Sequence, residues 1–150
     1  MAQSFCDIHL HIVFSTKHRE NLIDPAMEPR LYAYIGGIAK ALKCPLLAAG
    51  GMPDHIHLLV GLHSTIARAD LVRDLKANSS KWVRSEFEIG RGFGWQSGGG
   101  TFGVGHGDLP RVKKYIATQK THHAVQTFQE EFIAFLERAK QPYDPRYVWD

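Results

Sequence analysis

A turn between two strand-forming runs constrains the fold of this chain more than any other feature of the sequence. Residues 50–54 read Gly-Gly-Met-Pro-Asp, a composition typical of turns. A short apolar run precedes them at residues 45–49, and a run rich in strand-forming residues follows at residues 55–61. The two runs therefore predict an antiparallel hairpin.

The segments around this hairpin predict further strands and helices. Asp24 is a favourable N-cap and Pro25 a favourable first-turn residue, so we expect a helix from there to about residue 42. Residues 90–107 contain nine of the fourteen glycines and cannot form one regular element, but a short strand is expected near residues 101–106. The other predicted elements are a strand at residues 5–14 and helices at residues 64–87, 108–123 and 128–140, the last of them capped by Thr127.

This order, β-α-β-β-α-β followed by two helices, predicts an α+β fold. We expect an antiparallel sheet with helices on one face, which is a ferredoxin-like split β-α-β core plus C-terminal helices. A chain of 150 residues, 44% of them hydrophobic, is large enough for a core of its own. We therefore expect residues 1–150 to form a single domain.

Composition also indicates where the protein works. The longest apolar runs are far shorter than a membrane span, and the first residues lack the basic start and apolar stretch of a signal peptide. The only two cysteines, Cys6 and Cys44, lie far apart in apolar stretches, so we expect buried free thiols. These features predict a cytoplasmic protein with no membrane partner.

His55 and His57 are the first candidates for chemistry. Side chains alternate along a strand, so both would project from one face of the sheet, where two imidazoles can bind a divalent metal ion. A nucleotide hydrolase of the histidine-triad type would need a third histidine where Leu59 stands. A second pair, His9 and His11, has the same spacing but no acidic residue or turn directly before it, so we rank it lower.

Tyr115 and Gln119 are the second pair of candidates. They lie four residues apart in a predicted helix and therefore on the same face, at the edge of an apolar stripe. From there they can reach a site between helix and sheet. Gln119 offers an oxygen ligand and Tyr115 a phenolic nucleophile, although a role in packing is the common alternative for such residues.

The glycine-rich segment is a weaker signal. Gly98-Gly99-Gly100 is not followed by the Gly-Lys-Ser or Gly-Lys-Thr of a P-loop and lacks the context of a dinucleotide site. It is either a flexible connector or a loop over a bound strand, in which case Trp95 or Phe102 would stack on a base.

Together these residues resemble one family along nearly the whole chain. The string Asp54-His55-Ile56-His57-Leu58-Leu59 resembles the His-hydrophobic-His (HUH) motif of the single-tyrosine, IS200-like transposases of small insertion sequences. Residues 115–123 resemble the catalytic helix of that family. Residues 11–19, 79–82 and 95–98 resemble its opening strand and basic turn, its central helix and its Gly-rich segment.

The resemblance implies roles for four residues. His55, His57 and Gln119 would bind a divalent metal ion, Mg²⁺ or Mn²⁺, and Tyr115 would be the nucleophile. The implied activity is that of a DNA transposase, which cleaves and rejoins single-stranded DNA at hairpin-marked element ends through a 5′-phosphotyrosine intermediate. The resemblance also implies a homodimer, in which the tyrosine helix can complete the site of the other subunit.

The charge distribution is compatible with this partner. The net charge of +3 permits a nucleic acid ligand, and basic residues gather in the stretch that holds the candidate site. The side chains that we expect to contact single-stranded or hairpin DNA are Lys17, Arg19, Arg73, Lys76, Lys81, Arg84, Lys113, Lys114 and Lys120.

Two other functions stay open from the sequence. The Gly-rich segment of the family usually reads Gly-aromatic-Gly-Ala-Phe-Ser, whereas residues 98–103 here read Gly-Gly-Gly-Thr-Phe-Gly. This departure is the motive for one alternative, a domesticated or inactive transposase-derived protein that binds hairpin DNA without cutting it. The other is a metal-dependent phosphoesterase for small nucleotides, which would need neither a basic groove nor a tyrosine.

Overall fold

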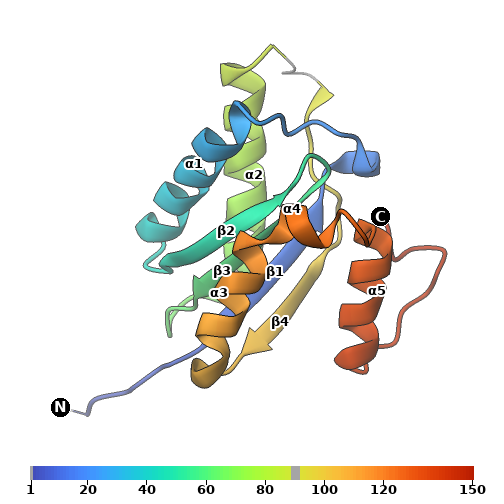
Figure 1. Cartoon of the computed structure of the whole chain (residues 1–150). Helices are drawn as coiled ribbons and strands as arrows, with labels where there is room; N and C mark the ends of the chain where they lie inside the picture. The colour runs from blue at the N-terminus through green and yellow to red at the C-terminus, as the bar shows by residue number, and fades with distance from the viewer. Residues whose placement is uncertain (1, 89–91) are drawn as a thin grey trace.

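A four-stranded antiparallel sheet forms the centre of the computed structural model, which describes residues 2–88 and 92–150 (Figure 1). Its strands lie in the order β2-β3-β1-β4. They are β1 (His9–Ser15), β2 (Leu46–Met52), β3 (His55–Gly61) and β4 (Gly100–Val104). The connecting helices are α1 (Met27–Ala41) and α2 (Arg68–Glu86). The predicted α+β fold with a split β-α-β core is therefore confirmed.

The C-terminal part of the chain returns across the sheet. Its helices are α3 (Leu109–Ala117), α4 (Gln119–His122) and α5 (Phe128–Arg138), and two short 3-10 helices lie at η1 (Lys17–Arg19) and η3 (His106–Asp108). In Figure 1, α2 passes behind the strands with α1 alongside it, whereas α3 and α4 cross in front of the strands and α5 lies beside β4. Helices α1 and α2 pack on Phe14 and Ile56, whereas α5 packs on Val13 of the opposite face. The sheet is thus covered on both faces, by the core helices on one side and by the C-terminal helices on the other.

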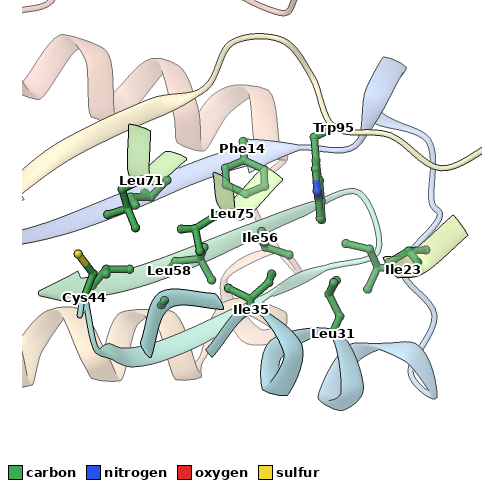
Figure 2. Packing of buried hydrophobic residues seen from close by; sticks show 14 of the residues in the cluster. Phe14, Ile23, Leu31, Ile35, Cys44, Ile56, Leu58, Leu71, Leu75 and Trp95 are labelled. Atoms are coloured by element: carbon green, nitrogen blue, oxygen red, sulfur yellow. The ribbon is translucent and has the colours of Figure 1, made fainter. Parts of the chain in front are cut away.

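Alternation along the central strands separates the two faces. Phe14 of β1 and Ile56 and Leu58 of β3 are buried in the main hydrophobic core against α1 and α2 (Figure 2). The alternate residues of β3, His55 and His57, point to the opposite face, where α4 and α5 lie. A single strand therefore contributes to the core with one side and to a polar cluster with the other.

The hairpin turn is shorter than the sequence indicated. Strand β2 continues through both glycines to Met52, so only residues 53–54 connect it to β3. A Cβ atom on Gly50 would lie 2.3 Å from the carbonyl oxygen of Ile116, closer than atoms can approach. Gly50 therefore serves to bring the end of α3 directly against the sheet, and not to form the turn.

Other local differences concern the ends of elements. The helix predicted at residues 108–123 is interrupted at Thr118 (φ −107°, ψ 23°), which separates α3 from α4. The cap of α5 is as predicted, because the hydroxyl oxygen of Thr127 accepts a hydrogen bond from the Glu130 N–H at 3.2 Å. Helix α2 begins at Arg68, later than expected. Residues 90 and 91, the start of the predicted glycine-rich loop, lie outside the described residues.

The two cysteines have different environments. Both are free, and Cys44 is buried in the main core, but Cys6 is exposed, so the expectation of a buried thiol is wrong for Cys6. Cys6 precedes β1 in an extended segment that no element covers. Within the described part of the chain, no helix is both long enough and apolar enough to cross a bilayer.

Candidate active site

The two imidazoles of β3 are fully buried and each is held by a partner at Nδ1. His55 Nδ1 lies 2.7 Å from the Oδ1 atom of Asp54. His57 Nδ1 lies 2.8 Å from Nε2 of His11, which belongs to the pair that the sequence ranked lower. Partners of this kind hold a ligating histidine in one orientation. Here they leave both Nε2 atoms directed toward α4 and α5.

Gln119 and Tyr115 reach the same place from α4 and α3. The Gln119 Oε1 atom lies 3.4 Å from His55 Nε2. The Tyr115 ring lies edge-on to the His57 ring, with 5.8 Å between their centroids. The break in the helix at Thr118 does not separate the pair. The imidazoles, the amide and the phenol named from the sequence therefore meet within one chain.

A carboxylate that the sequence analysis missed lies at the centre of this group. Glu131 of α5 has only 2% of its surface exposed. Its Oε1 atom lies 2.9 Å from His57 Nε2, 3.2 Å from His123 Nε2 and 3.6 Å from His55 Nε2. One oxygen atom thus faces three imidazoles that come from β3 and from the segment between α4 and α5.

The second oxygen of the same carboxylate faces the candidate nucleophile. Glu131 Oε2 accepts hydrogen bonds from the Tyr115 hydroxyl and, at 3.3 Å, from the Gln119 amide. Helical periodicity was the signal available for Glu131: Phe128 and Phe132 define the buried face of α5, and Glu131 falls on that face. An acidic residue at such a position needs a partner, because burying an unpaired charge is costly.

The surroundings shift the pKa values of three histidines at this site, and not all in the same direction. Burial, followed by the proximity of His57, lowers the pKa of His11 to about 3. Burial also lowers the pKa of His57, against the opposing effect of Glu131. For His123 the hydrogen bond to Glu131 outweighs burial and raises the pKa.

The carboxylate and the phenol have opposite shifts. Burial alone would raise the pKa of Glu131, but hydrogen bonds from His123, His57 and Tyr115 hold it well below its ordinary value. Burial, and then the Glu131 carboxylate, raise the pKa of Tyr115 above that of a free phenol. At neutral pH this arrangement contains an anionic Glu131 next to a protonated Tyr115.

A cavity of about 220 Å³ lies beside Tyr115, between α3, α5 and β4. Phe102 and Phe135 line it, with their rings stacked at 5.3 Å between centroids, and so do the exposed side chains of Arg111 and Arg138. Aromatic faces and guanidinium groups are the chemistry that binds single-stranded nucleic acid. The cavity is therefore suited to a base and a phosphate next to the tyrosine.

Of the two aromatic residues expected to stack on a base, only Phe102 lies near this site. Trp95 is buried in the main core, its ring packs edge-on to Phe14, and its N–H donates to the Ser79 hydroxyl at 2.9 Å. Phe102 is half-buried on β4 and lines the cavity beside Tyr115.

Lys76 and Arg84, which were predicted to contact DNA, donate to backbone carbonyls of the glycine-rich segment. Lys76 Nζ is 3.0 Å from the carbonyl oxygen of Gln96, and burial lowers the pKa of this lysine to about 8. Arg84 donates to the carbonyl oxygen of Phe93 at 3.3 Å. These contacts attach α2 to the glycine-rich segment.

The other basic residues differ in their surroundings. Arg73 and Lys120 lie in ion pairs, with Asp70 at 3.1 Å and Glu28 at 2.8 Å. Arg19 lies over the Trp149 ring at 5.3 Å. Seven of the predicted contacts are exposed on the surface: Arg73, Arg84, Lys120, Lys17, Lys81, Lys113 and Lys114. Of these, the last two flank Tyr115 on α3.

Comparison with known proteins places the chain in a family. The family model described as "Transposase IS200 like" matches residues 4–119, which is more than half of the chain. This chain belongs to the IS200-like transposase family. No curated protein sequence matches it.

Two solved structures share the fold of this IS200-like transposase. One is a protein from Deinococcus radiodurans R1 assigned as a transposase, with 23% identity, a TM-score of 0.63, and coverage of 79% of this chain and 96% of the other. The second is a REP-associated tyrosine transposase bound to a REP hairpin, with 12% identity, a TM-score of 0.60, and coverage of 82% and 72%. At these identities the likeness shows the fold alone.

Proposed function

We propose that this IS200-like transposase cleaves and rejoins single-stranded DNA through a covalent 5′-phosphotyrosine at Tyr115. The observation that supports this function best is the meeting of the Tyr115 phenol with His55, His57 and Gln119 in one buried cluster. The fold neighbour bound to a hairpin supports the proposal that hairpin-marked DNA is the substrate.

The donor atoms at this site fit a divalent metal ion. The Nε2 atoms of His55 and His57 and the Oε1 atom of Gln119 converge from two elements, and Asp54 and His11 occupy the other nitrogens of the two rings. In this proposal they would hold the ion, whose contribution when bound is to draw charge from a non-bridging oxygen of the scissile phosphate.

The reaction itself exchanges one phosphodiester for another. The Tyr115 oxygen loses its proton and forms a bond to phosphorus while the bond from phosphorus to the 3′-oxygen breaks, and the leaving 3′-oxygen takes up a proton to become a 3′-hydroxyl. The phosphotyrosine ester conserves the energy of the broken bond, so rejoining by a 3′-hydroxyl releases Tyr115 and needs no ATP.

Activation of the nucleophile depends on Glu131. The Glu131 carboxylate accepts a hydrogen bond from the Tyr115 hydroxyl, and its negative charge disfavours ionisation of Tyr115 to the phenolate. The attack therefore requires that the negative charge of Glu131 be compensated or moved when DNA is bound.

The cavity beside Tyr115 would take the nucleotide next to the scissile phosphate. Phe102 and Phe135 offer aromatic faces to its base, while Arg111 and Arg138 offer cations to its phosphates. Contacts of this kind release counterions, so DNA binding should weaken as salt rises.

The oligomeric state is a separate part of the proposal. Because Tyr115 and the donor atoms meet in one chain, a homodimer is not needed to complete the site. We retain the homodimer as a prediction, which light scattering on the purified protein checks. We also retain the cytoplasm as the compartment, because the DNA substrate lies there.

The non-cutting alternative rests on the altered glycine-rich segment. The two glycines that replace the family's aromatic residue and serine have different environments. Gly99 has a φ of +132°, and a Cβ there would lie 2.8 Å from the Val13 carbonyl oxygen, whereas nothing lies within 4 Å of a Cβ on Gly103. The backbone conformation therefore requires glycine at position 99, which gives this part of the departure a cause other than loss of activity.

Covalent attachment tests the proposal against this alternative. Wild-type protein incubated with Mn²⁺ and a labelled hairpin oligonucleotide should give an adduct that survives denaturing electrophoresis. Tyr115→Phe should bind the oligonucleotide but give no adduct, whereas the exposed control Tyr147→Phe should react like wild type. An adduct that persists in Tyr115→Phe would contradict the proposal, and binding without an adduct in wild type would favour the non-cutting protein.

A further inference from the structure

The resemblance to the family implies no metal-binding role for the carboxylate of Glu131 or the imidazole of His123, yet they complete a closed set of donor atoms. Around this set the separations are 2.9 Å from Glu131 Oε1 to His57 Nε2 and 3.2 Å to His123 Nε2. From Gln119 Oε1 they are 3.0 Å to His123 Nε2 and 3.4 Å to His55 Nε2. Bonds of about 2.1 Å to a shared ion place neighbouring donors roughly 3.0–3.4 Å apart. The four donor–donor separations, 2.9–3.4 Å, are close to that range.

The partner at Nδ1 of His55 leaves the Nε2 atom of the same ring for a ligand. His55 Nδ1 is 2.7 Å from the Asp54 carboxylate, to which it donates a hydrogen bond. The Nε2 atom faces the oxygen atoms of Gln119 at 3.4 Å and Glu131 at 3.6 Å. A cation among these three atoms would be within reach of all of them.

The kind of donor narrows the kind of ion. Three imidazole nitrogens, one carboxylate oxygen and one amide oxygen form the set, and each of the three rings is largely buried. Mg²⁺ prefers oxygen ligands and retains several waters, whereas imidazole suits first-row transition metals. A nitrogen-rich set with little access to water therefore disfavours Mg²⁺.

We propose that Glu131 and His123 are metal ligands together with His55, His57 and Gln119, and that this site selects a transition-metal ion such as Mn²⁺, Co²⁺ or Zn²⁺ over Mg²⁺. The role of the ion here rests on the proposed function. The new element is that helix α5 contributes a ligand, Glu131, to the metal site. Coordination by Glu131 also compensates the negative charge that disfavours ionisation of Tyr115.

The ligand assignment is tested by metal affinity in the absence of DNA. Titration calorimetry with Mn²⁺ should show affinity at least about tenfold weaker for Glu131→Gln and for His123→Ala than for wild type. The adjacent residues provide matched controls. Glu130 is exposed on the same helix, and His122 stacks on Tyr115 instead of facing the donor atoms, so Glu130→Gln and His122→Ala should stay within about twofold of wild type.

A spectroscopic count of nitrogen ligands needs no variant and keeps the test valid if a variant fails to fold. Electron spin-echo modulation of the wild-type Mn²⁺ complex should show three imidazole nitrogens, and His123→Ala should show two. Mg²⁺ should bind at least about a hundredfold more weakly than Mn²⁺ in the same titrations. Mg²⁺ affinity equal to that of Mn²⁺ would overturn the choice of ion.

Other results would overturn the ligand assignment itself. A count of two nitrogens in wild type would exclude His123. Unchanged Mn²⁺ affinity in Glu131→Gln, with more covalent DNA adduct than wild type, would show that Glu131 blocks the phosphate instead of binding the ion. That outcome would leave the transposase function intact, whereas a three-nitrogen site in a wild-type protein that forms no adduct would support the metal site and contradict the function.

Discussion

The two faces of the sheet differ in how they are held together. Toward α1 and α2, strands β1 and β3 bury apolar side chains such as Phe14 and Leu58 in one continuous cluster. Toward α3, α4 and α5 the same strands bury His11 and His57, which are paired to each other, and His57 is also paired to Glu131. The first face is stabilised by removal of apolar surface from water, and the second by hydrogen bonds that compensate buried polar groups.

This difference shows how a small chain combines stability with chemistry. Because side chains alternate along a strand, β3 contributes to the core without exposing its histidines to the same environment. Burial of apolar side chains on one face stabilises the fold and offsets the free-energy cost of burying polar groups on the other. Substitutions on the two faces should therefore have different effects. Those on the apolar face should alter stability, and those on the polar face should alter metal binding, pH dependence and DNA contacts.

The largest expected effect is the loss of stability when the apolar face is truncated. Leu58→Ala removes a fully buried side chain and should lower the free energy of unfolding by roughly 2–5 kcal/mol. Urea denaturation measures the change. The Mn²⁺ affinity of the folded fraction should not change, and a loss of metal binding in a variant that remains folded would show that the two faces are not independent.

The second expected effect is a pH dependence that belongs to the polar face. His11 has a pKa of about 3 when folded and about 6.5 when unfolded, so below pH 6.5 the unfolded chain binds more protons and stability falls as pH falls. At pH 4.5 the loss from His11 should be about 2–3 kcal/mol.

His57 acts in the same direction as His11, and His123, whose pKa is raised, acts in the opposite direction. Urea midpoints between pH 7 and 4.5 should therefore show a smaller slope for His11→Phe than for wild type. Leu58→Ala should shift the whole curve without changing its slope. An unchanged slope in His11→Phe would contradict the assignment of this titration to the buried histidine.

A smaller effect is expected at the cavity beside Tyr115. Phe102→Ala should weaken binding of a hairpin oligonucleotide with an unpaired flank by about 1–3 kcal/mol, because one aromatic face is lost. Fluorescence anisotropy measures the affinity. The exposed residue Phe5 lies outside the cavity and gives the control, Phe5→Ala. If Phe102→Ala and Phe5→Ala changed the oligonucleotide affinity equally, the proposal that a DNA base occupies the cavity would be wrong.

The smallest expected effect concerns the phosphates. Lys113 and Lys114 are exposed and flank Tyr115, so replacing either with alanine should reduce the slope of log affinity against log salt by about one. Lys40 lies at the end of α1, on the other side of the sheet, and Lys40→Ala should leave the slope unchanged. A change of slope in Lys40→Ala alone would place the DNA on the apolar side.

The sequence was sufficient for features that depend on local patterns. Alternation placed His55 and His57 on one face, and the Thr127 cap marked the start of α5. The spacing of Tyr115 and Gln119 predicted that they lie close together, and they do so despite the break at Thr118, because both reach the same carboxylate. Such signals are set by neighbours within a few residues, so a single sequence shows them.

Features that depend on distant contacts could not be predicted in this way. The sequence predicts Gly50 in a turn, because a glycine that the close approach of Ile116 requires cannot be distinguished in the sequence from one that a turn requires. Glu131 follows the tyrosine by sixteen residues, and its partners are fixed only when α5 packs on the sheet. Periodicity indicates that Glu131 is buried, but it does not identify the atoms that pair with it.

Anomalous diffraction from crystals soaked in Mn²⁺ locates the ion relative to the Tyr115 phenol and so tests whether the tyrosine lies at a metal site. We expect a peak among the Nε2 atoms of His55, His57 and His123, next to Glu131 and on the same side of the sheet as Tyr115. The exposed cluster of Asp7, His9 and His106 is the alternative position within the described residues. A peak at that cluster, with none at the buried histidines, would contradict a metal-assisted tyrosine site.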